Sequence, residues 1–192
     1  MNIEKYQKVE VTSQDELRQW LTNHHQQMDP IWLVTFKKIE ADKYVSRDQV
    51  LDELIAFGWI DGVRSQLDDK RTMQLISPRK TKPWAKSYKV RANRLIAEGK
   101  MHPAGLLEVT KAIQSGGWDA MNEVDELVIP NDLAVALKAH EPALAHFENF
   151  PASIKRNILR WIASAKTEPT RQKRILMTAN EARVNQRVKS HG

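Results

Sequence analysis

The sequence predicts an α+β fold, in which a small N-terminal sheet with accompanying helices is followed by an all-helical C-terminal portion. Two observations lead to this prediction. Runs rich in β-favouring residues lie only in the first 80 residues, whereas from residue 132 onward the apolar residues recur at helical spacing. We therefore expect an α+β region at 1–117, an acidic linker at 118–131 and a helical region at 132–192, either as separate units or around one shared core.

The N-terminal region begins with a strand, a helix and a second strand. Residues 5–11 have the pattern of a first strand. Ser13 with Glu16 has the form of a capping box, and the apolar residues that follow predict an amphipathic helix over 14–25. The apolar run 31–38 predicts a buried strand, and residues 40–44 a loop.

A second helix and a β-hairpin are predicted around residue 58. Ser46 with Gln49 forms another capping box, so a helix is expected up to Phe57, with Gly58 as the left-handed residue that ends it. Residues 59–67 and 72–76 are then short β-patterned runs separated by a polar turn.

A basic loop and two helices follow the hairpin. Pro78 and Pro83 cannot donate hydrogen bonds to a sheet, so 78–83 is predicted to be a loop. Helices are expected from Trp84 to Gly99 and from Pro103 to about residue 114. Seven cationic residues and no acidic residue occur in the stretch 79–94, namely Arg79, Lys80, Lys82, Lys86, Lys89, Arg91 and Arg94.

The C-terminal region is predicted to be helical throughout. The segment 118–131 is acidic and ends near Pro130, which is typical of a linker. Helices are expected at about 132–139, 142–148, 152–165 and 168–188, with Pro142 and Pro151 in first turns. One apolar stripe is formed by Ile154, Ile158, Trp161, Ile162 and Ala165.

The amino-acid composition excludes several kinds of protein chemistry and favours an anionic partner. The absence of cysteine excludes disulfides and thiolate chemistry, and no apolar stretch is long enough to span a bilayer. Because residues 1–10 also lack the apolar core of a signal peptide, we expect a cytoplasmic protein. The net charge of +6 favours an anionic partner, either an acidic protein or a nucleic acid.

Motifs of known chemistry are missing. The sequence has no G-x-S-x-G, no phosphate-binding glycine-rich loop and no dinucleotide fingerprint, and its six histidines are scattered without a metal-ligand spacing. We therefore predict no cofactor and no metal, and the sequence favours a non-enzymatic function.

Three motifs of the central stretch together resemble a known family. They are FGWIDG at 57–62, the basic segment 78–86, and LIAEGKMHPAG at 95–105. Upstream IWLVTFKK at 31–38 and downstream ILRWI at 158–162 have the same order and spacing. Over nearly the whole chain, the sequence resembles the YdeI/OmpD-associated proteins, a bacterial family named for a link to bacteriocin protection. The resemblance implies a role in protection against bacteriocins or antimicrobial peptides and in envelope stress.

The basic loop is the main candidate binding site. Lysines and arginines beside an aromatic side chain suit phosphate contacts and stacking. The alternative is that Trp84 belongs to the core and the basic side chains form a solvated face. The candidate ligand-binding or anion-binding residues are Arg79, Lys80, Lys82, Trp84, Lys86 and Asp61.

Two other functions remain as alternatives to a protection protein. One is a nucleic-acid-binding module that uses the basic loop 79–94 and the C-terminal arginines. The other is an enzyme with a site near Asp61, which follows Ile60 at a predicted strand start. An Asp-Gly pair is also an ordinary backbone signal that needs no chemistry.

Overall fold

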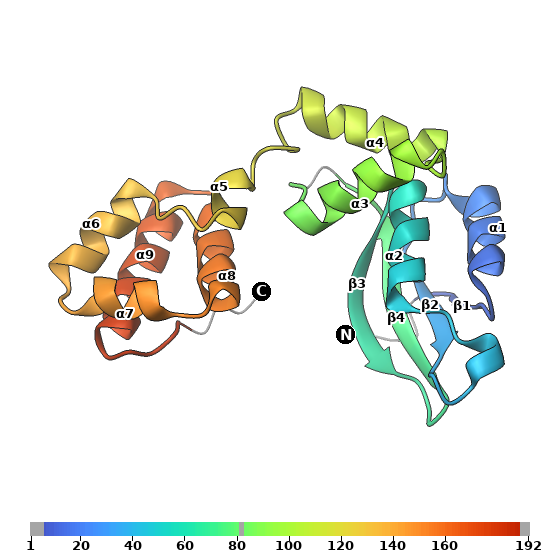
Figure 1. Ribbon diagram of the computed structural model, residues 1–192, viewed down its shortest axis with the longest axis horizontal. Helices are drawn as coiled ribbons and strands as arrows, with labels where there is room; N and C mark the ends of the chain where they lie inside the picture. Colours follow the sequence, from blue (N-terminus) through green and yellow to red (C-terminus); the bar gives the residue numbers. More distant parts are fainter. Residues whose placement is uncertain (1–5, 81–82, 189–192) are drawn as a thin grey trace. The chain divides into compact units, whose positions relative to one another are not determined.

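The computed structural model describes residues 6–80 and 83–188, and the chain divides into two compact units, 1–119 and 120–192. The first unit contains a four-stranded sheet with helices, and the second is helical (Figure 1). The predicted α+β class is therefore confirmed. No helix within the described ranges is long and apolar enough to cross a membrane.

The sheet of the first unit has the strand order β1-β2-β4-β3. Its strands are β1 (Lys8–Glu10), β2 (Ile31–Phe36), β3 (Trp59–Gln66) and β4 (Arg71–Pro78). β1 pairs with β2 in parallel, and β4 is antiparallel to both β2 and β3. The register of β3 shifts between Asp61 and Arg64, which marks a bulge in this edge strand.

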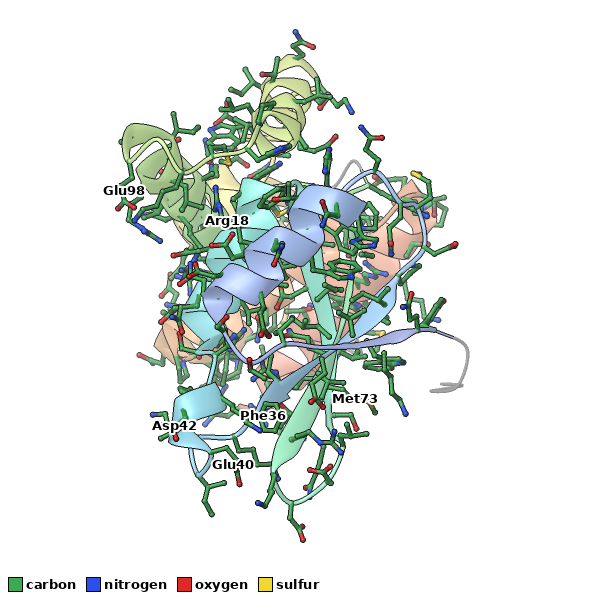
Figure 2. The ribbon with its side chains drawn as sticks, turned by 90° about the vertical axis from the view of Figure 1, so that its right-hand side faces the viewer. Arg18, Phe36, Glu40, Asp42, Met73 and Glu98 are labelled. Carbon is green, nitrogen blue, oxygen red and sulfur yellow. The ribbon has the colours of Figure 1, made fainter. Side chains whose placement is uncertain are left out.

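The predicted hairpin is confirmed, and its turn is held by a side chain. Asp68 Oδ1 accepts hydrogen bonds from the backbone N–H groups of Lys70 at 2.9 Å and Arg71 at 2.7 Å. Lys70 Nζ also lies 2.7 Å from Glu40, next to the short 3-10 helix η2 (Ala41–Lys43) in the predicted loop. Figure 2 shows Phe36, Glu40 and Asp42 at this end of the unit, opposite Glu98.

Four α-helices complete the first unit. They are α1 (Gln14–His24), α2 (Arg47–Ala56), α3 (Lys86–Ala97) and α4 (Pro103–Gln114). Ser46 and Gln49 form the predicted capping box, and Gly58 and Gly99 have φ values of +72° and +67°, as expected for residues that end helices. The helix predicted from Trp84 begins at Lys86.

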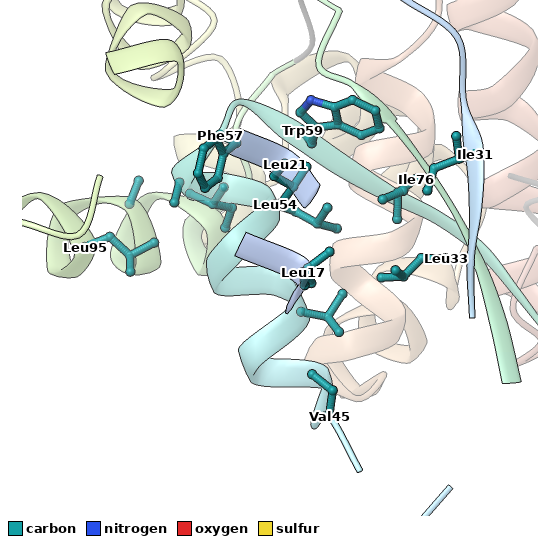
Figure 3. Close-up of a cluster of buried hydrophobic side chains, with 14 of the residues drawn as sticks. Leu17, Leu21, Ile31, Leu33, Val45, Leu54, Phe57, Trp59, Ile76 and Leu95 are labelled. Atoms are coloured by element: carbon teal, nitrogen blue, oxygen red, sulfur yellow. The ribbon is translucent and has the colours of Figure 1, made fainter. Parts of the chain in front are cut away.

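Helices α1 and α2 pack on one face of the sheet. Leu17, Leu21 and Leu54 of these helices are fully buried and face Ile31, Leu33 and Ile76 of the strands (Figure 3). The alternating pattern of the strands thus places one set of apolar side chains against an amphipathic helical layer. This packing fixes the positions of the ends of α2 and β4. The candidate site lies next to these two ends.

Helix α4 approaches α2 closely because residue 105 has no side chain. A Cβ atom at Gly105 would lie 2.2 Å from the backbone oxygen of Ala56, far inside contact distance. Gly105 is itself buried within α4. The helices could hold this separation only with glycine at this position.

Replacing Gly105 with alanine should destabilise the first unit. Helix propensity alone would favour alanine by up to about 1 kcal/mol, but the forced separation of α2 and α4 should cost more, for a net loss of about 1–3 kcal/mol. Urea unfolding followed by tryptophan fluorescence measures the change. Gly117→Ala is the matched control, since its new Cβ would meet only ordinary contacts of 3.4 and 3.7 Å. Equal stability of the two variants would contradict the close approach.

His102 caps the start of α4 through its ring. Its Nδ1 accepts a hydrogen bond from the backbone N–H of Ala104 at 3.2 Å, which requires an unprotonated nitrogen. Burial, together with the nearby charges of His25 and Arg18, lowers the pKa of His102 below its ordinary value of 6.5. The folded state therefore binds a proton less readily than the unfolded chain at this residue.

The sign of this shift predicts how stability depends on pH. The contribution of His102 is fully present above pH 6.5 and is lost as the pH falls below this value toward the lower pKa of the folded state. His102→Asn keeps a capping side chain that does not titrate. We expect this variant to lose less stability than the native chain between pH 7 and mildly acidic pH, as measured by urea unfolding. Parallel pH profiles would contradict the prediction.

The second unit is a bundle of five helices within its described residues. They are α5 (Asn122–Asp125), α6 (Asn131–Ala139), α7 (Ala143–Asn149), α8 (Ala152–Ala163) and α9 (Glu168–Arg183). Pro142 and Pro151 directly precede α7 and α8, where a missing N–H has no cost. Ile158 and Ile162 of the predicted stripe are buried beside Phe147.

The segment 118–131, for which the sequence predicts a linker, contains helix α5. Its residue Val124 is 7% exposed and belongs to the core of the second unit, while Met121 and Leu127 pack against that core. Apolar residues inside an acidic stretch thus attach residues 120–131 to the helical bundle, whereas Trp118 packs on the core of the first unit.

Candidate functional site

The candidate site is centred on Arg79, the residue that follows β4. Its backbone N–H donates a hydrogen bond to the oxygen of Gly58 at 2.8 Å, which fixes the residue to the turn between α2 and β3. The side chain is only 8% exposed. A buried guanidinium needs partners to offset its desolvation, so its surroundings are informative.

Two aromatic rings flank the guanidinium. The Arg79 Cζ atom lies 4.0 Å from the ring centroid of Trp84 and 5.5 Å from that of Tyr88. Trp84 is 1% exposed and packs on Trp118 at a centroid distance of 5.1 Å. Cation–π contacts of this kind favour a charged arginine, but they leave its N–H groups available for hydrogen bonding.

The hydrogen-bonding capacity of Arg79 is largely unused. Its Nη2 donates to the oxygen of Pro83 at a long distance of 3.4 Å, and neither Nε nor Nη1 has a partner within the described residues. Burial lowers the pKa of Arg79 below its ordinary value, while nearby Tyr88, Glu108 and Asp61 act in the opposite direction. The site therefore contains a buried cation with free donors.

Asp61 does not supply the missing acceptor. It accepts a short hydrogen bond from the hydroxyl of Tyr88 and a second one, at 3.1 Å, from Gln74 Nε2. Gln74 Oε1 in turn accepts from Arg64 Nη2 at 2.9 Å. Burial and the bond to Asp61 raise the pKa of Tyr88 well above its ordinary value, so this residue remains a donor at neutral pH.

A pocket of about 210 Å³ opens beside Arg79, between the loop after β4 and helix α4. Its lining contains three cationic side chains and one carboxylate, and Lys111 Nζ lies 2.8 Å from Glu108 Oε1. This pairing leaves Arg79 and Lys80 as the excess positive charge. The lining residues are Arg79, Lys80, Pro83, Trp84, Glu108, Lys111, Ala112, Ser115 and Gly117.

The structure brings only some of the predicted site residues to the pocket. Arg79, Lys80 and Trp84 line it, whereas Asp61 lies behind Tyr88 and is outside the lining. Lys86 is the exposed first residue of α3 and does not line the pocket. Lys82 lies outside the described residues.

Sequence reasoning missed the contribution of α4 and the segment after it. Glu108, Lys111 and Gly117 reach the pocket from positions about 30 residues beyond the basic loop. The i,i+3 spacing of Glu108 and Lys111 indicates a helical ion pair, but no local pattern places that pair beside Arg79.

Several other basic residues have internal partners. Arg91 lies 2.7 Å from Asp48 and 2.6 Å from Asp52, and Arg94 lies 2.7 Å from Asp52, so α3 is tied to α2. The second unit contains similar pairs, which are Arg171 with Asp132 at 2.6 Å and Arg156 and Arg160 with Asp125 at 3.9 and 3.7 Å. Much of the positive charge that the sequence shows is therefore neutralised within each unit.

The chemistry that the site supports is binding of an anion. Guanidinium and ammonium groups donate to oxyanion oxygens, and the aromatic wall excludes water from the same place. The part of the chain that the structure describes has no group of three or more histidine, aspartate or glutamate side chains placed to hold a metal ion.

Two family models match different parts of the chain. Residues 9–108 match the family described as Domain of unknown function (DUF8412), and residues 126–184 match the family described as Bacteriocin-protection, YdeI or OmpD-Associated. No curated protein and no solved structure matches. The resemblance predicted over nearly the whole chain is thus shown for its C-terminal part.

The hydroxyl of Tyr88 should contribute measurably to stability. Tyr88→Phe leaves a half-buried carboxylate with one hydrogen bond fewer, for an expected loss of about 1–2 kcal/mol in unfolding free energy. Urea unfolding measures the loss. Tyr44→Phe is the matched control, because Lys38 Nζ lies over the Tyr44 ring and the Tyr44 hydroxyl has no hydrogen-bond partner among the described residues. A Tyr88→Phe variant as stable as this control would show that the bond contributes nothing.

Proposed function

This chain belongs to the family of the domain of unknown function DUF8412, and from this premise we propose that it is a non-enzymatic, cytoplasmic bacterial protein that acts by binding in protection against bacteriocins or antimicrobial peptides. The observation that carries the protection role is the match of residues 126–184 to the bacteriocin-protection family. The first unit contributes the binding site, at the pocket beside Arg79.

Binding is favoured over catalysis by the state of Asp61. Both of its carboxylate oxygens accept hydrogen bonds, from Tyr88 and from Gln74. A general base must be free to take a proton from substrate, so this pairing favours a positioning role for Asp61. We therefore rank an enzyme with a site near Asp61 below both the protection protein and the nucleic-acid-binding module.

A small anion is favoured over a nucleic acid as the partner. Nucleic acids bind through many exposed phosphate contacts, whereas Arg91 and Arg94 are engaged with carboxylates of α2. Arg79 is buried, so it suits one enclosed anionic group better than an extended backbone. The nucleic-acid alternative would depend on exposed residues such as Lys80 and Lys86.

Deletion of the gene in its host tests the proposed role. We expect the deletion strain to become more sensitive to at least one bacteriocin or cationic antimicrobial peptide in a panel, measured as a lower inhibitory concentration. A plasmid copy of the native gene should restore resistance. Unchanged sensitivity across the panel would refute the protection role.

A further inference from the structure

We propose that the pocket beside Arg79 binds an oxyanion group, a carboxylate or a phosphate monoester, carried on a small molecule with a flat apolar body. The inference rests on the proposed function, since it names the ligand class of the same binding site. Arg79 is the main ligand to the anionic group, and the exposed Pro83 forms the wall against which the apolar body lies.

The charges of the pocket favour an anion. Glu108 is engaged by Lys111 at 2.8 Å, and Asp61 is engaged by Tyr88 and Gln74. Neither carboxylate forms an ion pair with Arg79 within the described residues. A guanidinium that is 8% exposed and has no direct ion pair within the described residues is costly, and an entering oxyanion reduces that cost.

The free hydrogen-bond donors point to an oxyanion in particular. Nε and Nη1 of Arg79 are buried and have no hydrogen-bond partner among residues 6–80 and 83–188, and the contact from Nη2 to Pro83 is long at 3.4 Å. A carboxylate or phosphate group offers several oxygens spaced to pair with the donors of a planar guanidinium, a geometric match that a single spherical halide ion lacks. Because little water reaches these donors, each bond is worth more than at an exposed arginine.

The remaining lining indicates the body of the ligand. Pro83 presents exposed apolar surface, Trp84 and Ala112 lie buried beneath the pocket, and Gly117 adds no side chain. A volume of about 210 Å³ is below the range of roughly 300–1,000 Å³ typical of sites for drug-sized ligands. The pocket therefore suits a compact molecule, such as one ring bearing one acidic group.

The test is a titration of the full chain with four probes at constant ionic strength, namely inorganic phosphate, phenyl phosphate, acetate and benzoate. Tryptophan fluorescence and calorimetry report binding, and thermal unfolding reports stabilisation by the ligand. We expect saturable binding of at least one ring-bearing probe, tighter than that of the corresponding simple anion. The comparison of phenyl phosphate with benzoate distinguishes the two sources of the oxyanion.

Arg79→Met is the decisive variant, because methionine is apolar and of similar length. We expect it to weaken binding by at least about tenfold while the thermal midpoint without ligand stays equal or rises. Arg183→Leu is the matched control, since it removes one positive charge from an exposed position of the second unit and should bind normally. Arg79→Lys keeps the charge and loses the planar donor group, so it should bind the probes weakly. This variant takes the place of Arg79→Met if Arg79→Met does not fold.

Three results would overturn the inference. The first is that no probe binds saturably, and the second is that binding survives the loss of Arg79. The third is that Arg79→Met has a lower thermal midpoint while the native chain responds to no probe. This last result would mark Arg79 as a purely structural residue. Failure of this inference and failure of the protection role are distinguishable. If deletion of the gene causes sensitivity and the Arg79→Met gene restores resistance fully, the protection role stands without the anion site. If deletion has no effect, the titration still decides whether the site exists.

Discussion

Helix α2 carries the polar contacts on which the first unit depends. Its Glu53 is only 3% exposed and is paired with Arg18 Nη1 at 2.9 Å and with Gln14 Nε2 at 2.7 Å, both from α1. On another face of the helix, Asp52 accepts from Arg91 and Arg94 of α3. A buried carboxylate that lost these donors would be strongly destabilising, so the pairs fix how α1 and α3 lie against α2.

The same helix positions the candidate site. Its C-terminal end, at Ala56, receives α4 at the distance that Gly105 allows, and the following Gly58 accepts the backbone N–H of Arg79. The C-terminal end of α2 therefore positions both walls of the pocket, which are the loop after β4 and helix α4. Any change that moves this end should alter the pocket and the packing together, which is the usual behaviour of a site built on rigid elements.

Ion pairs within each unit neutralise many of the basic residues, so the positive charge of the pocket beside Arg79 stands out. Several arginines pair with a carboxylate on a neighbouring helix, as Arg91 and Arg171 illustrate. Arg79 differs because aromatic rings surround it and the nearby Asp61 is already occupied by Tyr88. In the part of the chain that the structure describes, this buried cation has no ion-pair partner, which lowers stability, and proteins retain such features where function requires them. A ligand that completes its hydrogen bonds would remove this cost.

The sequence by itself determined the local structure of this protein, because capping boxes, apolar periodicity and proline positions act over a few residues. The capping box of Ser46, the glycine that ends α2 and the hairpin of β3 and β4 all follow from such signals. It also singled out Arg79 and Trp84 as candidates. Only the tertiary structure decided which charges are neutralised and which residues meet, because those contacts join positions tens of residues apart. The pairing of Asp61 with Tyr88 and the approach of α4 to the basic loop are of this kind, as is the lack of partners for Nε and Nη1 of Arg79 among the described residues.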